Sequence, residues 1–95
     1  MTLQKINEIL ATGRRREMSR ALYELENEIR EGEKHFYIFG KKLEVSEWND
    51  CFIHYEYNRD NEKYELYYNI EGTTKTGKYF YVKSTDAIAK HIDIR

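Results

Sequence analysis

The sequence predicts one two-layer α+β domain, because helical and strand-like patterns occupy separate parts of its 95 residues. Apolar residues recur at helical spacing in the first third. All aromatic residues except Tyr23 lie between Phe36 and Tyr81, in short runs separated by turn-forming residues, and such residues favour the half-buried surface of a sheet. We therefore expect N-terminal helices, an antiparallel β-meander of four to five strands and a short C-terminal helix around one core.

Two helices are expected in the first third. The first covers about residues 2–12, with Thr2 as its N-cap and Gly13 just beyond its end. The second covers about residues 14–31 and ends before Gly32. Its apolar residues follow one another at intervals of four, three and four, so they form one stripe that we expect to face the core: Met18, Leu22, Leu25 and Ile29.

The middle of the chain predicts a meander. The expected strands cover about residues 35–39, 42–45, 51–57, 62–70 and 78–83. Gly40-Lys41 forms the turn of the first hairpin, because glycine at the first central position allows a positive φ. The polar residues 58–61 form the turn of the second hairpin. Residues 46–50 are expected to be a connection and residues 71–77 a loop.

The last element expected is a helix over about residues 85–92. Ser84 or Thr85 would cap it, and Asp86 in its first turn suits the helix dipole.

Strand alternation assigns side chains to the two faces of the sheet. In 62–70 the even-numbered residues are the more apolar, so they should point to the core, together with Phe80 and Val82. In 51–57 the odd-numbered residues form the more apolar set. The outer face is then expected to carry Tyr67, Tyr79, Tyr81 and Lys83, with His54 and Glu56 nearby if strand order follows sequence order.

Composition narrows the functional classes. The single cysteine cannot form an internal disulfide, and no apolar stretch is long enough to cross a bilayer, so we expect a cytoplasmic protein without a membrane partner. Cys51 and His54 are three residues apart on one strand and face opposite sides, so they predict no metal site. No motif indicates a cofactor.

Two motifs suggest chemistry that their context does not support. Residues 72–78 fit the first seven positions of a phosphate-binding loop, but Tyr79 replaces the required Ser or Thr and a strand follows instead of a helix. We therefore expect an ordinary hairpin loop. His54 and Glu56 share a strand face and could act as an acid–base pair, but no nucleophile accompanies them. The sequence accordingly predicts no enzyme.

The charge distribution is uneven although the formal net charge is only −1. Residues 44–71 carry eight acids against two bases, whereas an arginine-rich run occurs near the start of the second helix. These arginines suit phosphate contacts, but pairing with neighbouring glutamates such as Glu17 and Glu24 explains them more simply.

These features favour a small non-enzymatic protein-binding module, an inhibitor or regulator that docks an acidic, tyrosine-rich sheet face on a basic partner surface. A nucleic-acid-processing enzyme is one candidate partner, since carboxylates can imitate phosphates. In composition the chain is like accessory proteins of phages and mobile elements, including inhibitors of host defence. The expected partner-binding residues are Glu56, Glu62, Glu65, Tyr67, Tyr79 and Tyr81.

The alternative is a single-stranded nucleic-acid binder that stacks bases on the sheet tyrosines. It requires the basic ends of the chain to lie together. Its phosphate-binding residues would be Arg14, Arg15, Arg16, Arg20, Lys78 and Lys83. A homodimer is compatible with either function.

Overall fold

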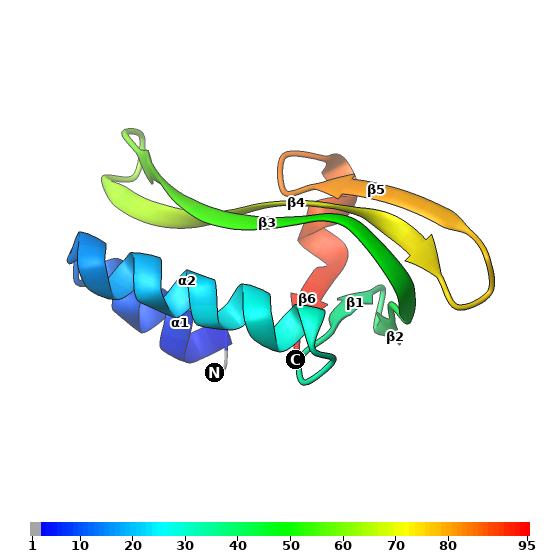
Figure 1. Cartoon of the computed structure of the whole chain (residues 1–95). Helices are drawn as coiled ribbons and strands as arrows, with labels where there is room; N and C mark the ends of the chain where they lie inside the picture. The colour runs from blue at the N-terminus through cyan, green and yellow to red at the C-terminus, as the bar shows by residue number, and fades with distance from the viewer. Residues whose placement is uncertain (1–2) are drawn as a thin grey trace.

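The computed structural model describes residues 3–95. Within them the chain forms two α-helices, a short 3-10 helix and two three-stranded antiparallel sheets, so the predicted α+β class is confirmed. The larger sheet has the order β3-β4-β5 and forms one layer (Figure 1). The helices and the smaller sheet, of order β2-β1-β6, lie beneath it and leave its other face open.

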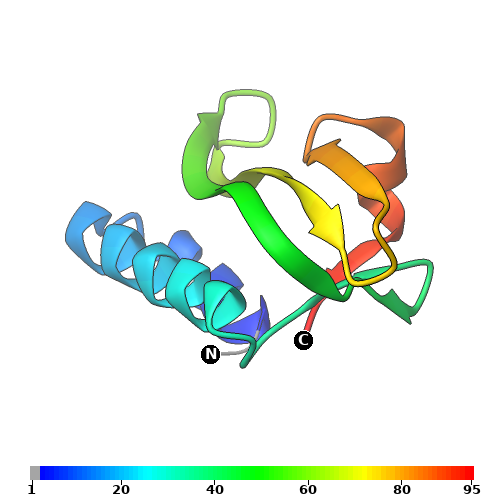
Figure 2. The same ribbon diagram turned by 45° about the vertical axis from the view of Figure 1, so that its right-hand side comes forward.

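Both N-terminal helices are confirmed. α1 spans Leu3–Ala11 and α2 spans Arg15–Arg30, while the predicted cap Thr2 lies outside the described residues. Gly13 separates them with a φ of 68°, a left-handed conformation that glycine adopts readily. α1 packs against β4 and α2 against β3 (Figure 2). The helix stripes in the core are formed by Ile6, Leu10, Met18, Leu22, Leu25 and Ile29.

The second predicted hairpin is present but longer than expected. β3 spans Val45–Asn58 and β4 spans Lys63–Thr74, joined by a turn at residues 59–62. The expected connection at residues 46–50 was wrong, because these residues belong to β3. Residues 71–74, expected as loop, belong to β4, and residues 71–73 pair with β5, Tyr79–Lys83.

Irregular pairing explains why these strand segments were missed. The register shifts between Val45 and Glu47 and again between Trp48 and Asp50, which interrupts the period-two alternation of β3. Opposite this region, Gly72 is buried, and a Cβ there would lie 2.3 Å from the Glu47 carbonyl oxygen. The glycine that resembled a loop residue therefore marks a close approach of two strands.

The first hairpin is shifted from its predicted position. β1 spans Phe36–Ile38 and β2 only Lys41–Lys42, so the strand expected at 42–45 was wrong. The two turn residues are Phe39 and Gly40, with φ values of 51° and 78°. A two-residue turn with positive φ at both positions matches the twist of the paired strands. The glycine is thus the second central residue of the turn, not the first.

The expected C-terminal helix was also wrong. Residues Ala87–His91 form a 3-10 helix and Ile92–Ile94 form β6, which pairs with β1. Residues 36–42 consequently belong to a separate small sheet, and the single meander divides into two sheets. The spacing of Ile88 and Ile92 fits a helix. Residues 92–94 instead form backbone hydrogen bonds with β1, which is distant in sequence, and this tertiary pairing outweighs the local helical preference.

The core fills the space between the layers. Most of the predicted inward positions of the larger sheet hold. Cys51, Ile53, Tyr68, Ile70 and Val82 are buried, whereas Tyr57 near the end of β3 is 50% exposed. Ring contact at 5.2 Å between Phe36 and Tyr68 joins the small sheet to the large one. Among the described residues, neither helix has the length and apolar character needed to cross a bilayer.

Candidate functional site

The open face of the larger sheet, which we call the outer sheet face, is the candidate site (Figures 1 and 2). No element within residues 3–95 covers it in these views. Strand alternation and the pairing register define its members. They are Glu47, Asp50, Phe52, His54 and Glu56 of β3, Lys63, Glu65, Tyr67, Asn69, Glu71 and Thr73 of β4, and Tyr79, Tyr81 and Lys83 of β5.

One aromatic cluster crosses β3 and β4. His54 is paired with Tyr67 across the two strands, and their ring centroids are 5.8 Å apart. Phe52 lies on the other side of His54 at 4.9 Å, and 52% of its surface is exposed. A phenylalanine this exposed on an open sheet face is costly in water and useful in an interface.

A second aromatic cluster lies on β5. Tyr79 and Tyr81 are 63% and 45% exposed, respectively. The Tyr79 hydroxyl donates a hydrogen bond to Glu71 on β4, and this bond raises the pKa of the phenol. The Lys83 ammonium lies 5.3 Å from the centre of the Tyr81 ring, a cation–π contact. Both rings are thus oriented by polar partners while their surfaces remain accessible.

Carboxylates flank these clusters in like-charged pairs. Asp50 is directly opposite Glu71, and Glu56 is directly opposite Glu65. Opposed like charges destabilise a strand pair, by about 0.2–1 kcal/mol. The outer sheet face carries five carboxylates against two ammonium groups, which come from Lys63 and Lys83.

Residues at the tip of the β3–β4 hairpin form hydrogen bonds with one of these carboxylates, Glu65. Asn61 donates a 2.7 Å hydrogen bond to Glu65, and this bond, with a second from Asn58, lowers the pKa of the Glu65 carboxyl. Glu65 therefore stays ionised to lower pH than an isolated glutamate. The predicted site residue Glu62 lies in the turn, with a φ of 54°, beside the outer sheet face.

The basic residues predicted for nucleic-acid binding are not brought together. Arg14, Arg15, Arg16 and Arg20 lie at the start of α2, in the layer beneath the sheet, and Arg14 pairs with Glu17 at 3.2 Å. Lys78 lies in the turn between β4 and β5, at the opposite end of the molecule from the start of α2 (Figure 1). Lys83 accompanies the tyrosines without the arginines.

Sequence reasoning left several members of the outer sheet face out of the predicted site, among them Phe52, Asp50 and Glu71. Phe52 shares its strand face with His54 and Glu56, so alternation alone could have included it. Asp50 and Glu71 were assigned to a connection and a loop. Their pairing follows from the register shift beside Trp48, which no local pattern announces.

The chemistry of the sheet is limited. His54 Nε2 lies 3.2 Å from Glu56, so the predicted pair exists, but Cys51 is on the buried face. Burial raises the pKa of the Cys51 thiol to about 12, so it is a poor nucleophile at neutral pH. Among the described residues, no group of three His, Cys, Asp or Glu side chains could hold a metal ion.

Comparison with known proteins adds no functional information. The fold and the outer sheet face must therefore be interpreted from their own geometry. Searches of protein-family models, of curated proteins and of solved structures each found no match to this chain.

Proposed function

We propose that this chain is a non-enzymatic protein-binding module that docks its outer sheet face on a basic surface of a partner protein. The observation that carries the proposal is the alternation of exposed aromatic clusters with like-charged carboxylate pairs on one uncovered face. The carboxylate pairs Asp50–Glu71 and Glu56–Glu65 reduce the stability of the free chain. Lysine or arginine side chains of a partner would relieve that repulsion.

The aromatic residues supply the contact area of such an interface. Tyrosine offers a large apolar surface with few rotatable bonds and a hydroxyl for hydrogen bonding. Tyr67 lies beside the pair Glu56–Glu65, and Phe52 and Tyr81 lie beside the pair Asp50–Glu71. Binding energy at interfaces concentrates in aromatic anchors of this kind, while the surrounding charges direct the approach of the partner.

A partner that normally binds phosphates fits this face best, because its basic groups are already arranged for closely spaced negative charges. The module would then act as an inhibitor or regulator of a nucleic-acid-processing enzyme. An accessory protein of a phage or mobile element that blocks a host defence enzyme is one such role.

The test compares three tagged proteins in capture from lysate of the native or host cell after nuclease treatment. They are the wild type, the face variant Glu56→Lys/Glu65→Lys, and the matched control Glu24→Lys/Glu33→Lys, whose changed residues are exposed on the helix layer. A photo-crosslinking residue at position 52 identifies proteins that touch the outer sheet face.

The proposal expects a protein that the wild type and control retain, that the face variant loses, and that crosslinks at position 52. Equal retention of the same proteins by all three would contradict it. If the wild type captures nucleic acid and Tyr79→Ala does not, the result would instead favour the base-stacking alternative. The exposed rings of Tyr79 and Tyr81 beside Lys83 are the observation that supports this alternative.

A further inference from the structure

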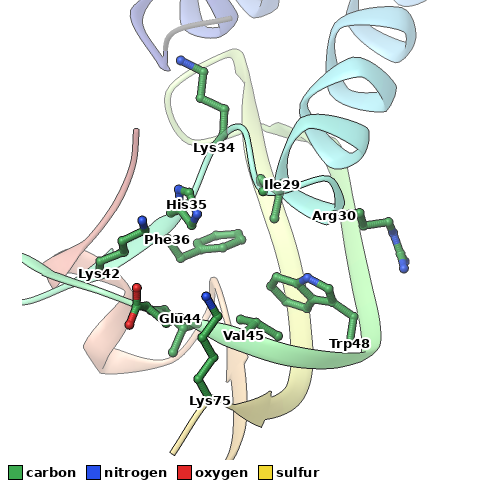
Figure 3. A pocket seen from close by; sticks show the side chains of 12 residues that line it. Ile29, Arg30, Lys34, His35, Phe36, Lys42, Glu44, Val45, Trp48 and Lys75 are labelled. Carbon is green, nitrogen blue, oxygen red and sulfur yellow. The ribbon is translucent and has the colours of Figure 1, made fainter.

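A cavity of about 340 Å³ opens beneath the larger sheet, apart from the outer sheet face (Figure 3). Its walls come from the end of α2, from β1, from the segment that links β2 to β3, and from Lys75 in the turn after β4. All of the lining residues except Lys75 lie within residues 29–48. Its volume is at the lower end of the range for small-molecule sites, about 300–1,000 Å³.

The floor of the cavity is apolar and partly aromatic. Ile29 and Phe36 are buried, and Trp48 is half-buried with its indole ring at the cavity wall (Figure 3). Edge-on contact with Phe80, at 5.7 Å between ring centroids, supports the indole from behind. The floor therefore offers a fixed surface on which a flat ring can pack.

The rim is positively charged. Lys34, Lys42 and Lys75 line it (Figure 3). None of the three lysines forms an ion pair with another residue in the part of the chain that the structure describes. Arg30 points away and donates a 3.2 Å hydrogen bond to the Cys51 carbonyl oxygen, so it is already engaged.

Two further charged or titratable groups face this rim. Glu44 is the only carboxylate among the lining residues, too few to neutralise the lysines. The pKa of His35 is lowered, first by burial and then by the charge of Lys42, with a further contribution from Lys75 and opposition from Glu44. The neutral form of a histidine is favoured where other cations lack counter-charges.

Backbone hydrogen bonds hold the rim segments in place. The Leu43 amide donates to the Phe36 carbonyl at 2.7 Å, and the Lys75 amide donates to the Glu44 carbonyl at 3.0 Å. The lysines thus project from segments that are fixed before any ligand arrives, which reduces the entropy lost on binding.

We propose that this cavity binds a small phosphate monoester that carries a flat ring, with the phosphate at Lys42 and Lys75 and the ring against Trp48 and Phe36. A phosphate monoester carries about −1.5 to −2 charges at neutral pH and presents three acceptor oxygens. A carboxylate has only a single charge and two oxygens. The phosphate therefore matches several lysines from separate segments better than a carboxylate does. The cavity has room for one ring and one phosphate.

Backbone amides play no part in this site, unlike in a phosphate-binding loop. In residues 72–78 the amides of Thr74, Lys75, Gly77 and Lys78 all donate to atoms of the protein itself. The resemblance to that motif is therefore coincidental, and the turn contributes only the Lys75 side chain. The proposed site also shares no residue with the outer sheet face, so it stands independently of the proposed docking function.

The test uses the intrinsic fluorescence of Trp48, the only tryptophan of the chain. The full chain is titrated at constant ionic strength with adenosine 5′-monophosphate, adenosine and inorganic phosphate as probes. We expect a saturable change with the monophosphate and affinities at least about tenfold weaker for adenosine and for phosphate, because each lacks one half of the ligand.

Paired lysine variants locate the site. Lys42→Gln/Lys75→Gln should bind the monophosphate at least about tenfold more weakly, since charge-assisted contacts are lost. Lys41→Gln/Lys90→Gln removes the same charge from exposed positions that do not line the cavity and should bind as the wild type does. Circular dichroism of each variant checks that it is folded.

Three results would overturn the proposal. One is the absence of a fluorescence change at millimolar monophosphate, and another is equal affinity in the two lysine variants. The third is inorganic phosphate or adenosine binding as tightly as the monophosphate, which would indicate an adventitious anion or a purely apolar contact. Equilibrium dialysis of Trp48→Phe, expected to retain phosphate-dependent but weaker binding, checks the result without the fluorescent probe.

Discussion

The two faces of the β3–β4–β5 sheet are built by the same strands but have opposite chemistry. The inner face places Cys51, Ile53 and Ile70 in the core, whereas the outer face exposes Phe52 beside like-charged carboxylate pairs. Neighbouring residues of one strand thus have different roles, one in the core and the next on the exposed surface. The inner set stabilises the fold by burial. The outer set reduces stability slightly, which is the pattern expected of residues kept for binding.

The largest effect is expected on the inner face. Ile70 is fully buried in the centre of the sheet, so Ile70→Ala should lower the free energy of unfolding by about 2–5 kcal/mol through lost burial and a cavity. Urea denaturation followed by circular dichroism measures this. A loss of less than about 1 kcal/mol would show that the inner face is not the core.

A smaller loss is expected where β3 and β4 approach most closely. In Gly72→Ala the new methyl group would meet the Glu47 carbonyl oxygen and the Phe80 ring, so the strands must separate. We expect a cost of about 1–3 kcal/mol, the usual range for overpacking. Gly77→Ala provides a contrast, because a Cβ there meets no atom and only its φ of 86° is strained. Thermal unfolding of both variants compares the two effects, because Gly72→Ala reports steric crowding and Gly77→Ala reports backbone strain.

Alkaline pH should destabilise the fold through Cys51. Its folded pKa is about 12 against an ordinary value of 9.0, so the unfolded chain releases the thiol proton first. Stability is therefore full below pH 9 and falls as the pH rises from 9 toward 12, with a loss of about 1 kcal/mol near pH 10. Urea denaturation of the wild type and Cys51→Ala at several pH values measures the difference. Equal pH dependence in both proteins would rule out this contribution.

On the outer face the sign should reverse. Glu56→Gln removes one charge from the pair with Glu65, so it should raise the free energy of unfolding by about 0.2–1 kcal/mol while weakening partner capture. The control Glu24→Gln, exposed on α2, should change neither. Destabilisation by Glu56→Gln would mean that its 3.2 Å contact with His54 outweighs the repulsion.

The smallest change in stability is expected at Tyr79. Its ring is 63% exposed, so Tyr79→Ala should alter the free energy of unfolding by less than about 0.5 kcal/mol. Its effect on single-stranded oligonucleotide binding distinguishes the two functional hypotheses. Base stacking requires a loss of about 1–3 kcal/mol and a steep dependence on salt. The docking function requires no oligonucleotide affinity in the wild type.

Local patterns account for the parts of the fold that sequence reasoning recovered. The stripe from Met18 to Ile29 lies within one helix, and the alternation that buries Tyr68 and Ile70 lies within one strand. In contrast, β6 depends on β1, more than fifty residues earlier, and its short sequence fits a helix equally well. Pairing distant in sequence is therefore what local propensity misses.

The candidate sites divide in the same way. Tyr67, Tyr79, Tyr81 and Glu56 could be assigned to the outer face because each strand reveals its own alternation. The cavity could not be found, because Lys34, Lys42 and Lys75 come from separate segments that meet only in the folded chain. A site that is assembled by tertiary packing has no local sequence pattern from which it could be predicted.

The pairing of β6 with β1 also sets an order of events during folding. The β3–β4 hairpin can close without any other segment, since its pairs are near one another in sequence. β1 must wait for residues 92–94, and the backbone bonds between His35 and Arg95 form later still. Phe36, 1% exposed in the folded protein, therefore remains without its β6 cover until residues 92–94 are in place beside β1.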